Sequence, residues 1–187
     1  MDSEEILTIY SCQKGELEKF SILYNKYIKR IYDFIFYKVH HKETAEDITS
    51  QIFFKALNKI QGFDPKKGTL QAWLYQIARN TVIDYYRTKK ENKNIEDAWD
   101  LCGDDDLERD IDAKAKLQEL EKYISKLKSD HRDILIMRIW QDLSYKEIAE
   151  AMGKSEDSCK MQFSRCIRKL REEMPMIVFI SFLLTRL

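Results

Sequence analysis

Residues 92–112, NKNIEDAWDLCGDDDLERDID, form an acidic segment without helical periodicity that divides the chain into two parts. The segment holds nine Asp or Glu residues against Lys93 and Arg109, a local balance of −7; because the whole chain is neutral, the remainder must sum to +7. A run of like charges repels itself and favours an extended conformation. We therefore predict an acidic linker at 92–112 between two basic parts, with a plain solvated tether as the simplest interpretation.

Composition favours helices on both sides of this linker. The 187 residues include only five Gly and two Pro, and apolar residues make up 44% of the chain, enough to form packed cores. Lys, Glu, Leu and Ile are abundant, whereas alternating β-branched runs are rare. We predict an all-α protein with small helical domains at 1–91 and 113–174, followed by an apolar tail at 175–187.

The first domain carries three stretches in which apolar residues recur every three or four positions, as in an amphipathic helix. These stretches begin near Leu17, Ile48 and Leu70. Between the second and the third lies GFDPKKG, residues 62–68, whose glycines, proline and lysines predict a cationic loop. In the second domain the helical period returns from about Ala113.

The stretch LSYKEIAEAMGKSEDSCK, residues 143–160, predicts two helices joined by a tight turn. Ser144 and Glu147 have the spacing of a capping box, in which each side chain accepts a backbone N–H at the helix start. Gly153 is suited to end the first helix in a left-handed conformation, and Ser155 is suited to cap the second. This pattern is typical of a helix-turn-helix.

The second helix of this hairpin has two chemically different faces. At about 100° per residue, one face is apolar and is predicted to meet the core: Cys159, Phe163, Cys166 and Leu170. The opposite face is polar and cationic: Asp157, Met161, Ser164, Arg165 and Arg168, flanked by Lys160 and Lys169. Arg suits guanine, Met suits the thymine methyl group, and Lys suits phosphates. We predict a DNA-reading face; the alternative is a solvated surface on a structural helix.

Three stretches resemble a known family when taken together. AEDITSQIFFKAL at 45–57 and TLQAWLYQIARNTVIDYYRTKK at 69–90 resemble the first conserved domain of bacterial extracytoplasmic-function (ECF) sigma factors. LSYKEIAEAMGKSEDSCKMQFSRCIRKLRE at 143–172 resembles their second. The order, the spacing and the acidic joint also match, over roughly residues 10–172. The resemblance implies a promoter-recognition subunit that binds core RNA polymerase.

The resemblance also implies a polymerase-docking helix at 45–57. This helix would contact the clamp helices of the largest polymerase subunit through Asp47, Ser50, Gln51 and Phe54. The flap of the second-largest subunit is a further implied contact of the chain. Ile48, Ile52 and Ala56 would pack inside the domain whether or not this helix docks on the polymerase.

The helix that begins near Leu70 raises a question of its own. Helical geometry predicts that one arc faces outward: Ala72, Tyr75, Gln76, Arg79, Ile83 and Tyr86. Its tyrosines either pack against a neighbouring helix or stack on unpaired bases. The resemblance implies capture of non-template bases at the minus-ten element, for which we expect these residues: Phe63, Lys66, Lys67, Thr69, Gln76, Arg79, Asn80, Tyr86, Arg87, Lys89 and Lys90. Trp73 is assigned mainly to the core.

For the minus-thirty-five element, the resemblance implies DNA contacts on the outward face of the second hairpin helix. The expected contacts are Ser155, Lys160, Met161, Ser164, Arg165, Arg168 and Lys169. The acidic linker is similar to the segment that in this family passes through the polymerase cleft toward the RNA exit channel.

The implied partners are core RNA polymerase, promoter DNA and an anti-sigma factor, either soluble or membrane-bound, and the implied location is cytoplasmic. A stand-alone helix-turn-helix regulator is a second interpretation; it would need a dimerisation helix or effector domain but no docking helix. An enzyme acting on nucleic acid is a third. Because no carboxylates cluster at metal spacing, and because His40, His41 and His131 lack evident partners, we expect no catalytic residues, metal or cofactor.

The cysteines and the apolar tail complete the sequence evidence. Cys12, Cys102, Cys159 and Cys166 form no CxxC pair, so we expect reduced thiols in a cytosol. The N-terminus lacks the pattern of a secretion signal. The apolar run after Pro175 is about half as long as a bilayer-spanning helix. It is interpreted as a packing helix, as an anti-sigma or membrane contact, or as an irregular chain end.

Overall fold

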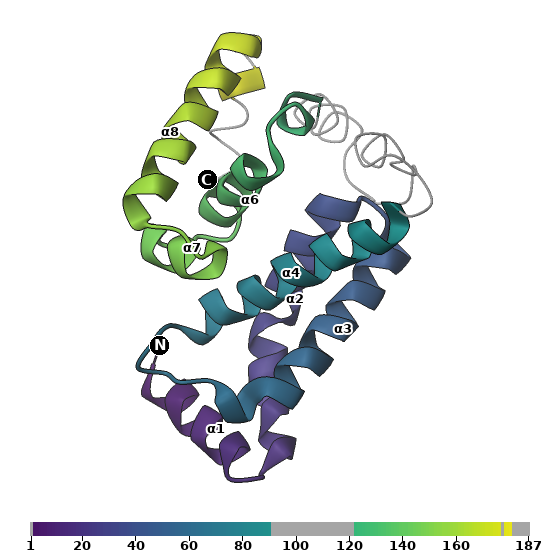
Figure 1. Cartoon of the computed structure of the whole chain (residues 1–187), viewed down its shortest axis with the longest axis vertical. Coiled ribbons are helices and arrows are strands. Elements are labelled where there is room, and N and C mark those ends of the chain that lie inside the picture. Colours follow the sequence, from purple (N-terminus) through teal and green to yellow (C-terminus); the bar gives the residue numbers. More distant parts are fainter. Residues whose placement is uncertain (1, 91–121, 177, 181–187) are drawn as a thin grey trace. The chain divides into compact units, whose positions relative to one another are not determined.

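The computed structural model describes residues 2–90, 122–176 and 178–180, which fall into two compact units. The first unit contains α1 (Ser3–Gln13), α2 (Phe20–Val39), α3 (Lys42–Lys59) and α4 (Leu70–Lys90), with short 3-10 turns at Leu17–Lys19 and Ile60–Gly62. The second contains a helical stretch at 122–125, then α6 (Ser129–Ile139), most of α7 (Tyr145–Met152) and α8 (Glu156–Glu173) (Figure 1). No strand occurs in the described ranges, so the all-α prediction with two helical domains is confirmed. The linker at 92–112 lies outside the described residues.

The core of the first unit forms where α2, α3 and α4 pack against one another (Figure 1). On α3 the expected side chains Ile48, Ile52 and Ala56 are buried. They meet apolar residues from α2, among which Ile31 and Phe34 are inaccessible to solvent. The predicted packing role of the inner face of α3 is therefore confirmed.

The prediction for the outward arc of α4 is wrong at two positions. Ala72 is buried, and Tyr75 is 0% exposed. The Tyr75 ring packs against the Phe34 ring of α2 in an edge-to-face contact, with the ring centroids 5.1 Å apart. The physical reason is that α4 packs against both α2 and α3, so it buries a wider arc than one line of apolar residues predicts. Gln76 and Ile83 are exposed as expected.

Helix α1 was not indicated by the apolar pattern, and polar contacts hold it to α2. Asp2 caps the helix by accepting a hydrogen bond from the backbone N–H of Glu5 at 2.7 Å. The buried Glu5 carboxylate accepts from the Tyr27 hydroxyl at 3.0 Å, and Lys26 forms ion pairs with both carboxylates. Burial, together with the Glu5 carboxylate, raises the pKa of Tyr27 above its usual range.

The junction between α2 and α3 is formed by two adjacent histidines. His40 ends α2 in a left-handed conformation with φ of 49°. His41 caps α3, because its Nδ1 accepts the backbone N–H of Thr44 at 3.3 Å. Both histidines therefore have a structural role at this turn.

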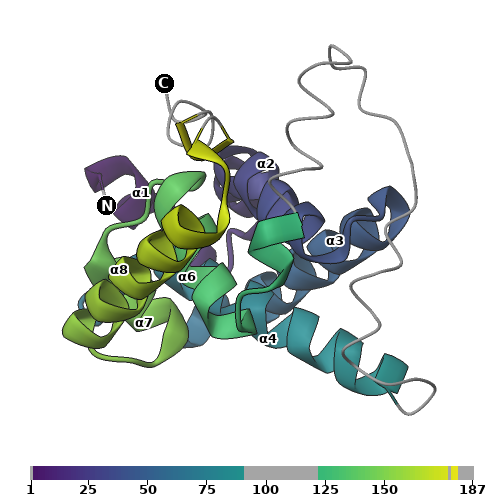
Figure 2. The same ribbon diagram turned by 90° about the horizontal axis from the view of Figure 1, so that it is seen from above.

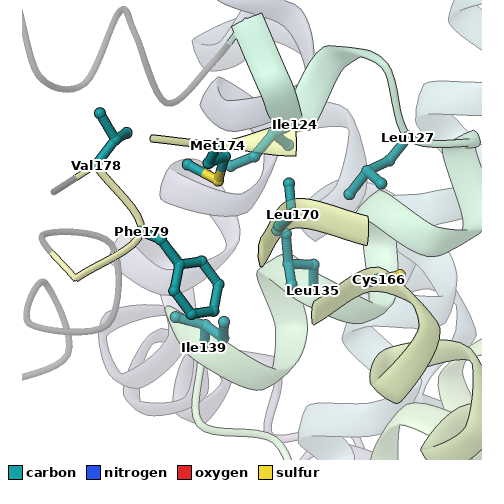
Figure 3. Close-up of a cluster of buried hydrophobic side chains, with 9 residues drawn as sticks. All are labelled: Ile124, Leu127, Leu135, Ile139, Cys166, Leu170, Met174, Val178 and Phe179. Carbon is teal, nitrogen blue, oxygen red and sulfur yellow. The ribbon is translucent and has the colours of Figure 1, made fainter. Parts of the chain in front are cut away.

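The core of the second unit extends into the apolar tail. Side chains from 122–127, α6 and α8 form one buried cluster with three residues beyond α8, Met174, Val178 and Phe179. The other members of the cluster are Ile124, Leu127, Leu135, Ile139, Cys166 and Leu170. Figure 3 shows the Phe179 ring directed toward Ile139. The packing interpretation is therefore supported for Val178 and Phe179, while 177 and 181–187 lie outside the described residues. None of the helices in the described ranges is long and apolar enough to cross a membrane.

Phe179→Ala is expected to destabilise the second unit, whereas Ile180→Ala is not. Phe179 is 9% exposed and Ile180 is 48% exposed, so only the first change removes core contacts. We expect a loss of about 2 kcal/mol in the free energy of unfolding, below the roughly 3–5 typical of interior Phe→Ala changes because Phe179 lies at the edge of the cluster.

Denaturant unfolding followed by Trp140 fluorescence measures this effect, since Trp140 packs against the cluster. The background should carry Trp73→Phe and Trp99→Phe so that only Trp140 reports. Equal unfolding midpoints for the Phe179 and Ile180 variants would contradict the packing role of the tail.

Candidate nucleic-acid interface

The helix-turn-helix of the second unit is fixed by local capping. The backbone N–H of Glu147 donates to Ser144 Oγ at 3.2 Å, and the backbone N–H of Ser144 donates to Glu147 Oε2 at 2.9 Å. Gly153 ends α7 with φ of 63°, where glycine carries no steric cost. Ser155 then caps α8 by accepting from the backbone N–H of Ser158. The predicted capping box, turn and second cap are all confirmed.

Aromatic and cationic contacts set how α7 meets its neighbours in the second unit. The Tyr145 ring contacts the Phe163 ring of α8 edge-on, with centroids 5.9 Å apart. Tyr145 also contacts the Arg138 guanidinium, whose Cζ lies 5.0 Å from the ring centroid. Arg138 also donates to the carbonyl of Leu143 at 2.8 Å, just before the capping box. The hairpin is thereby held to α6, which lies beside α8 (Figure 2).

The inner face of α8 is the apolar seam that the sequence predicts. Cys159, Cys166 and Leu170 are buried, and Phe163 is half-buried against the same cluster. Burial raises the pKa of Cys166 to about 11, and its Sγ donates to the carbonyl of His131 at 3.6 Å. A neutral, buried thiol is a poor nucleophile. These cysteines therefore serve as core residues.

The outer face of α8 presents two arginines to solvent. Arg165 and Arg168 are exposed, and neither forms an ion pair with any residue that the structure describes. The lysines differ: Lys160 pairs with Glu156 at 2.9 Å, and Lys169 pairs with Glu173 at 3.6 Å. The arginines can thus meet an anion without first breaking an ion pair with a described residue.

Two further predicted residues on this face are available to a ligand. Met161 and Ser164 are exposed on the same side of α8 as the arginines. Ser155, by contrast, already uses its hydroxyl oxygen to cap α8. The structure therefore brings six of the seven predicted minus-thirty-five residues together on an exposed face: Lys160, Met161, Ser164, Arg165, Arg168 and Lys169.

In the first unit, α3 presents a polar stripe with one large apolar side chain. The four predicted docking residues share an exposed face: Asp47, Ser50, Gln51 and Phe54. Asp47 is three and four residues before Ser50 and Gln51, and Phe54 is four and three residues after them, so all four lie along one side of the helix. Phe54 is among the most exposed large apolar residues of the described chain. Aromatic side chains are enriched in protein interfaces, so Phe54 is suited to contact a partner.

The loop at residues 63–69, here called the minus-ten loop after the role that the resemblance predicts for it, joins the turn after α3 to the start of α4. Phe63 was expected to face DNA, but its side chain is buried with its ring 5.0 Å from that of Trp73. Asp64 shapes the turn, since its side chain and its carbonyl accept the backbone N–H groups of Lys66 and Lys67 at 3.0 Å. Both lysine side chains are exposed. Phe63 thus packs beneath the loop against the rest of the unit, whereas Lys66 and Lys67 face solvent.

The predicted residues of α4 differ in accessibility. Gln76 and Asn80 are exposed, whereas Arg79 is half-buried. The Tyr86 hydroxyl donates to the carbonyl of Lys38 at 2.7 Å, so its ring is held against α2. Three other predicted residues are placed as follows: Thr69 caps α4, Arg87 pairs with Asp84 at 3.2 Å, and Lys89 donates to Tyr85 at 3.2 Å. The side chain of Lys90 lies outside the described residues.

Comparisons with known proteins match both units. The family model for Sigma-70 region 2 matches residues 23–92, and the model for Sigma-70 region 4 matches residues 117–170. The RNA polymerase sigma factor YlaC of Bacillus subtilis (strain 168) is 33% identical over 156 residues, which cover 81% of this chain and 90% of that protein. The ECF RNA polymerase sigma factor SigM of the same organism is 30% identical over 153 residues, covering 80% and 91%.

Solved structures support the fold. The structure of CnrH in complex with the cytosolic domain of CnrY has a TM-score of 0.68 at 19% identity and covers 89% of this chain and 94% of that one. The sigma factor RpoE in complex with the anti-sigma factor NepR from Bartonella quintana has a TM-score of 0.64 at 22% identity, covering 83% and 96%.

Both conserved regions are present in the expected order, and the region 2 match accounts for helices that a stand-alone regulator would not need. The chain therefore belongs to the ECF sigma factors, the alternative sigma factors that direct bacterial RNA polymerase to specific promoters.

Proposed function

We propose that the two units divide promoter recognition between them. Residues 1–91 dock on core polymerase through α3 and open the minus-ten element, residues 113–174 read the minus-thirty-five element through α8, and residues 92–112 link the two. The observation that carries the proposal is the different chemistry exposed on each unit. The first presents Phe54 within a polar stripe, and the second presents Arg165 and Arg168 without ion-pair partners among the described residues.

At the minus-ten element, the proposed roles follow from accessibility. Lys66 and Lys67 neutralise phosphates, while Gln76 and Asn80 bond the edges of an unpaired base. Extrusion of a base costs a few kcal/mol, which a fitted pocket must offset. Phe63 supports this pocket from below through its contact with Trp73. The remaining predicted residues of the first unit act at the rim of this pocket or on the DNA backbone: Thr69, Arg79, Tyr86, Arg87, Lys89 and Lys90.

At the minus-thirty-five element, α8 lies in the major groove with its outer face toward the bases. Arg165 and Arg168 bond guanine or phosphate, Met161 contacts a thymine methyl group, and Ser164 accepts or donates at either base. The major groove of B-form DNA admits an α-helix, and recognition helices of this type read bases from their N-terminal residues. The lysines that flank this face bind phosphates after releasing their glutamate partners.

The protein acts with core polymerase in the cytoplasm and carries no catalytic residues of its own. We also propose an anti-sigma partner. The support comes from the similar solved structures, because RpoE is complexed with the anti-sigma factor NepR and CnrH with the cytosolic domain of CnrY. The exposed stripe on α3 is one surface that such a partner would cover to block docking on the polymerase.

A DNA-binding assay with and without core polymerase tests the proposal. The chain with core should retain a duplex that carries both promoter elements, whereas the chain alone should bind the same duplex weakly. Tight binding of a palindromic site by a free dimer, without any gain from core polymerase, would instead favour a stand-alone regulator.

A further inference from the structure

Helix α1 contacts the minus-ten loop although it lies before the residues that match region 2, which begin at 23. Its apolar side is firmly seated, since Ile9 and Cys12 are inaccessible to solvent. Its first turn is tied to α2 by the ion pairs of Lys26 with Asp2 and Glu5. Because Ile9 and Cys12 lie in the second half of α1, their burial holds its C-terminal end in place, independently of the ion pairs at the first turn.

Gln13, the last residue of α1, connects this end of the helix to the start of the loop. Its Nε2 donates to the carbonyl of Ile60 at 2.9 Å and to the carbonyl of Phe63 at 2.7 Å. Both amide hydrogens of the side chain are thus used. The Ile60 carbonyl also accepts the backbone N–H of Phe63 at 3.2 Å, so the glutamine amide is a second donor at this turn.

The same side chain fixes the direction in which the loop begins. Phe63 is the first residue of the minus-ten loop, and its ring is already held against Trp73. At the other end Thr69 accepts the backbone N–H of Ala72 at 3.1 Å and so caps α4. With both ends fixed, Lys66 and Lys67 extend from a short, pre-shaped turn. A pre-shaped loop loses less conformational entropy when it binds a ligand.

We propose that Gln13 is a positioning residue for capture of the minus-ten strand. It touches no DNA; it holds the backbone of the minus-ten loop in the conformation that receives an unpaired base. The inference rests on the proposed function of this loop, and it adds α1 to the parts of the chain that determine how the minus-ten element is opened.

Gln13→Glu is the sharpest test, because it preserves size but removes both donors. A carboxylate facing two carbonyl oxygens is repelled, so the start of the loop should be released. With the holoenzyme, we expect about tenfold weaker binding of a fork-junction probe whose minus-ten element is single-stranded. We expect a similar fall in the rate of strand opening, followed by 2-aminopurine fluorescence. Affinity for core polymerase and for a duplex with only the minus-thirty-five element should not change.

Two controls separate positioning from stability. Gln61→Glu alters the same interface, where Gln61 donates to the carbonyl of Cys12 at 3.4 Å, but it leaves the Gln13 bonds in place, so its probe binding should stay near that of the native chain. Asp2→Asn weakens the anchor of α1 far from the loop, so it should lower the unfolding temperature without changing probe binding. If Gln13→Glu folds poorly, Gln13→Met removes the donors without adding charge and should show the same loss.

The outcomes are distinct. Native affinity and opening rate in both Gln13 variants would overturn the role of Gln13 alone, as would an equal loss in Asp2→Asn. If the native holoenzyme does not distinguish the fork-junction probe from a probe with a scrambled minus-ten strand, the proposed function fails, and the role of Gln13 fails with it.

Discussion

Arg165→Glu is expected to weaken binding of the holoenzyme to promoter DNA by about a hundredfold. A bidentate contact between Arg and guanine contributes about 1–3 kcal/mol of discrimination, and the new carboxylate would also be repelled by nearby phosphates. The fold should be unaffected, because Arg165 is exposed and forms no ion pair with any described residue. The measurement is a titration of labelled promoter duplex with holoenzyme at several salt concentrations.

Arg171→Glu is the matched control for this change. Arg171 lies on the same helix, is also exposed, and follows Arg165 by six residues, or about 9 Å along the helix axis. It is in the last turn of α8, away from the N-terminal part that a recognition helix directs at the bases. We expect a reduction of a few-fold at most for Arg171→Glu. Equal losses for the two variants would indicate general electrostatic attraction, and the assigned reading face would be wrong.

Phe54→Ala is expected to weaken binding to core polymerase by about thirtyfold or more. Large aromatic side chains at the centre of an interface commonly contribute at least about 2 kcal/mol to binding. Phe54 is 66% exposed in the free chain, so its truncation removes little of the core of the first unit. The thermal unfolding midpoint should therefore stay close to that of the native chain. Competition with a fluorescently labelled copy of the chain for core polymerase measures the affinity.

Leu7→Ala provides a control of the same exposure. Leu7 lies on α1 and is also 66% exposed, so the two changes remove apolar side chains of equal accessibility from different faces of the same unit. We expect Leu7→Ala to bind core polymerase as the native chain does. A larger loss for Leu7→Ala than for Phe54→Ala would place the docking surface on α1 instead of α3.

Local signals in the sequence predicted the second unit well. The capping box at Ser144 and Glu147 and the turn at Gly153 each depend on residues only a few positions apart. The apolar seam of α8 follows from helical spacing alone, and Cys159 and Cys166 are buried as that spacing requires. Such features are determined by neighbours along the chain, so the sequence is sufficient to predict them.

The errors arose where contacts between distant residues decide the outcome. The apolar spacing of α4 defines a single line of buried residues and places Tyr75 on the outside, whereas its ring partner Phe34 lies on α2. The resemblance assigns Phe63 to DNA, but its side chain is buried with its ring against that of Trp73. No local pattern singles out Gln13, because its carbonyl partners lie 47 and 50 residues later. Spacing patterns carry no information about partners at that separation.

The apolar tail is a second case in which contacts with distant residues decide the structure. Its composition fitted packing, partner binding or an irregular end equally well, and only the position of α6 shows that Phe179 has a place in a core. The direct DNA contacts and the docking contacts remain predictions from resemblance and accessibility, because they depend on partners that the chain does not contain.

Run-off transcription with purified core polymerase tests the central claim most directly. Fragmented genomic DNA from the source organism is transcribed by core polymerase with and without this protein, and the new RNA 5′ ends are mapped. We predict discrete start sites that appear only when the protein is present and that share sequence elements at the minus-ten and minus-thirty-five positions. An unchanged set of RNA ends after addition of the protein would contradict its assignment as a promoter-recognition subunit.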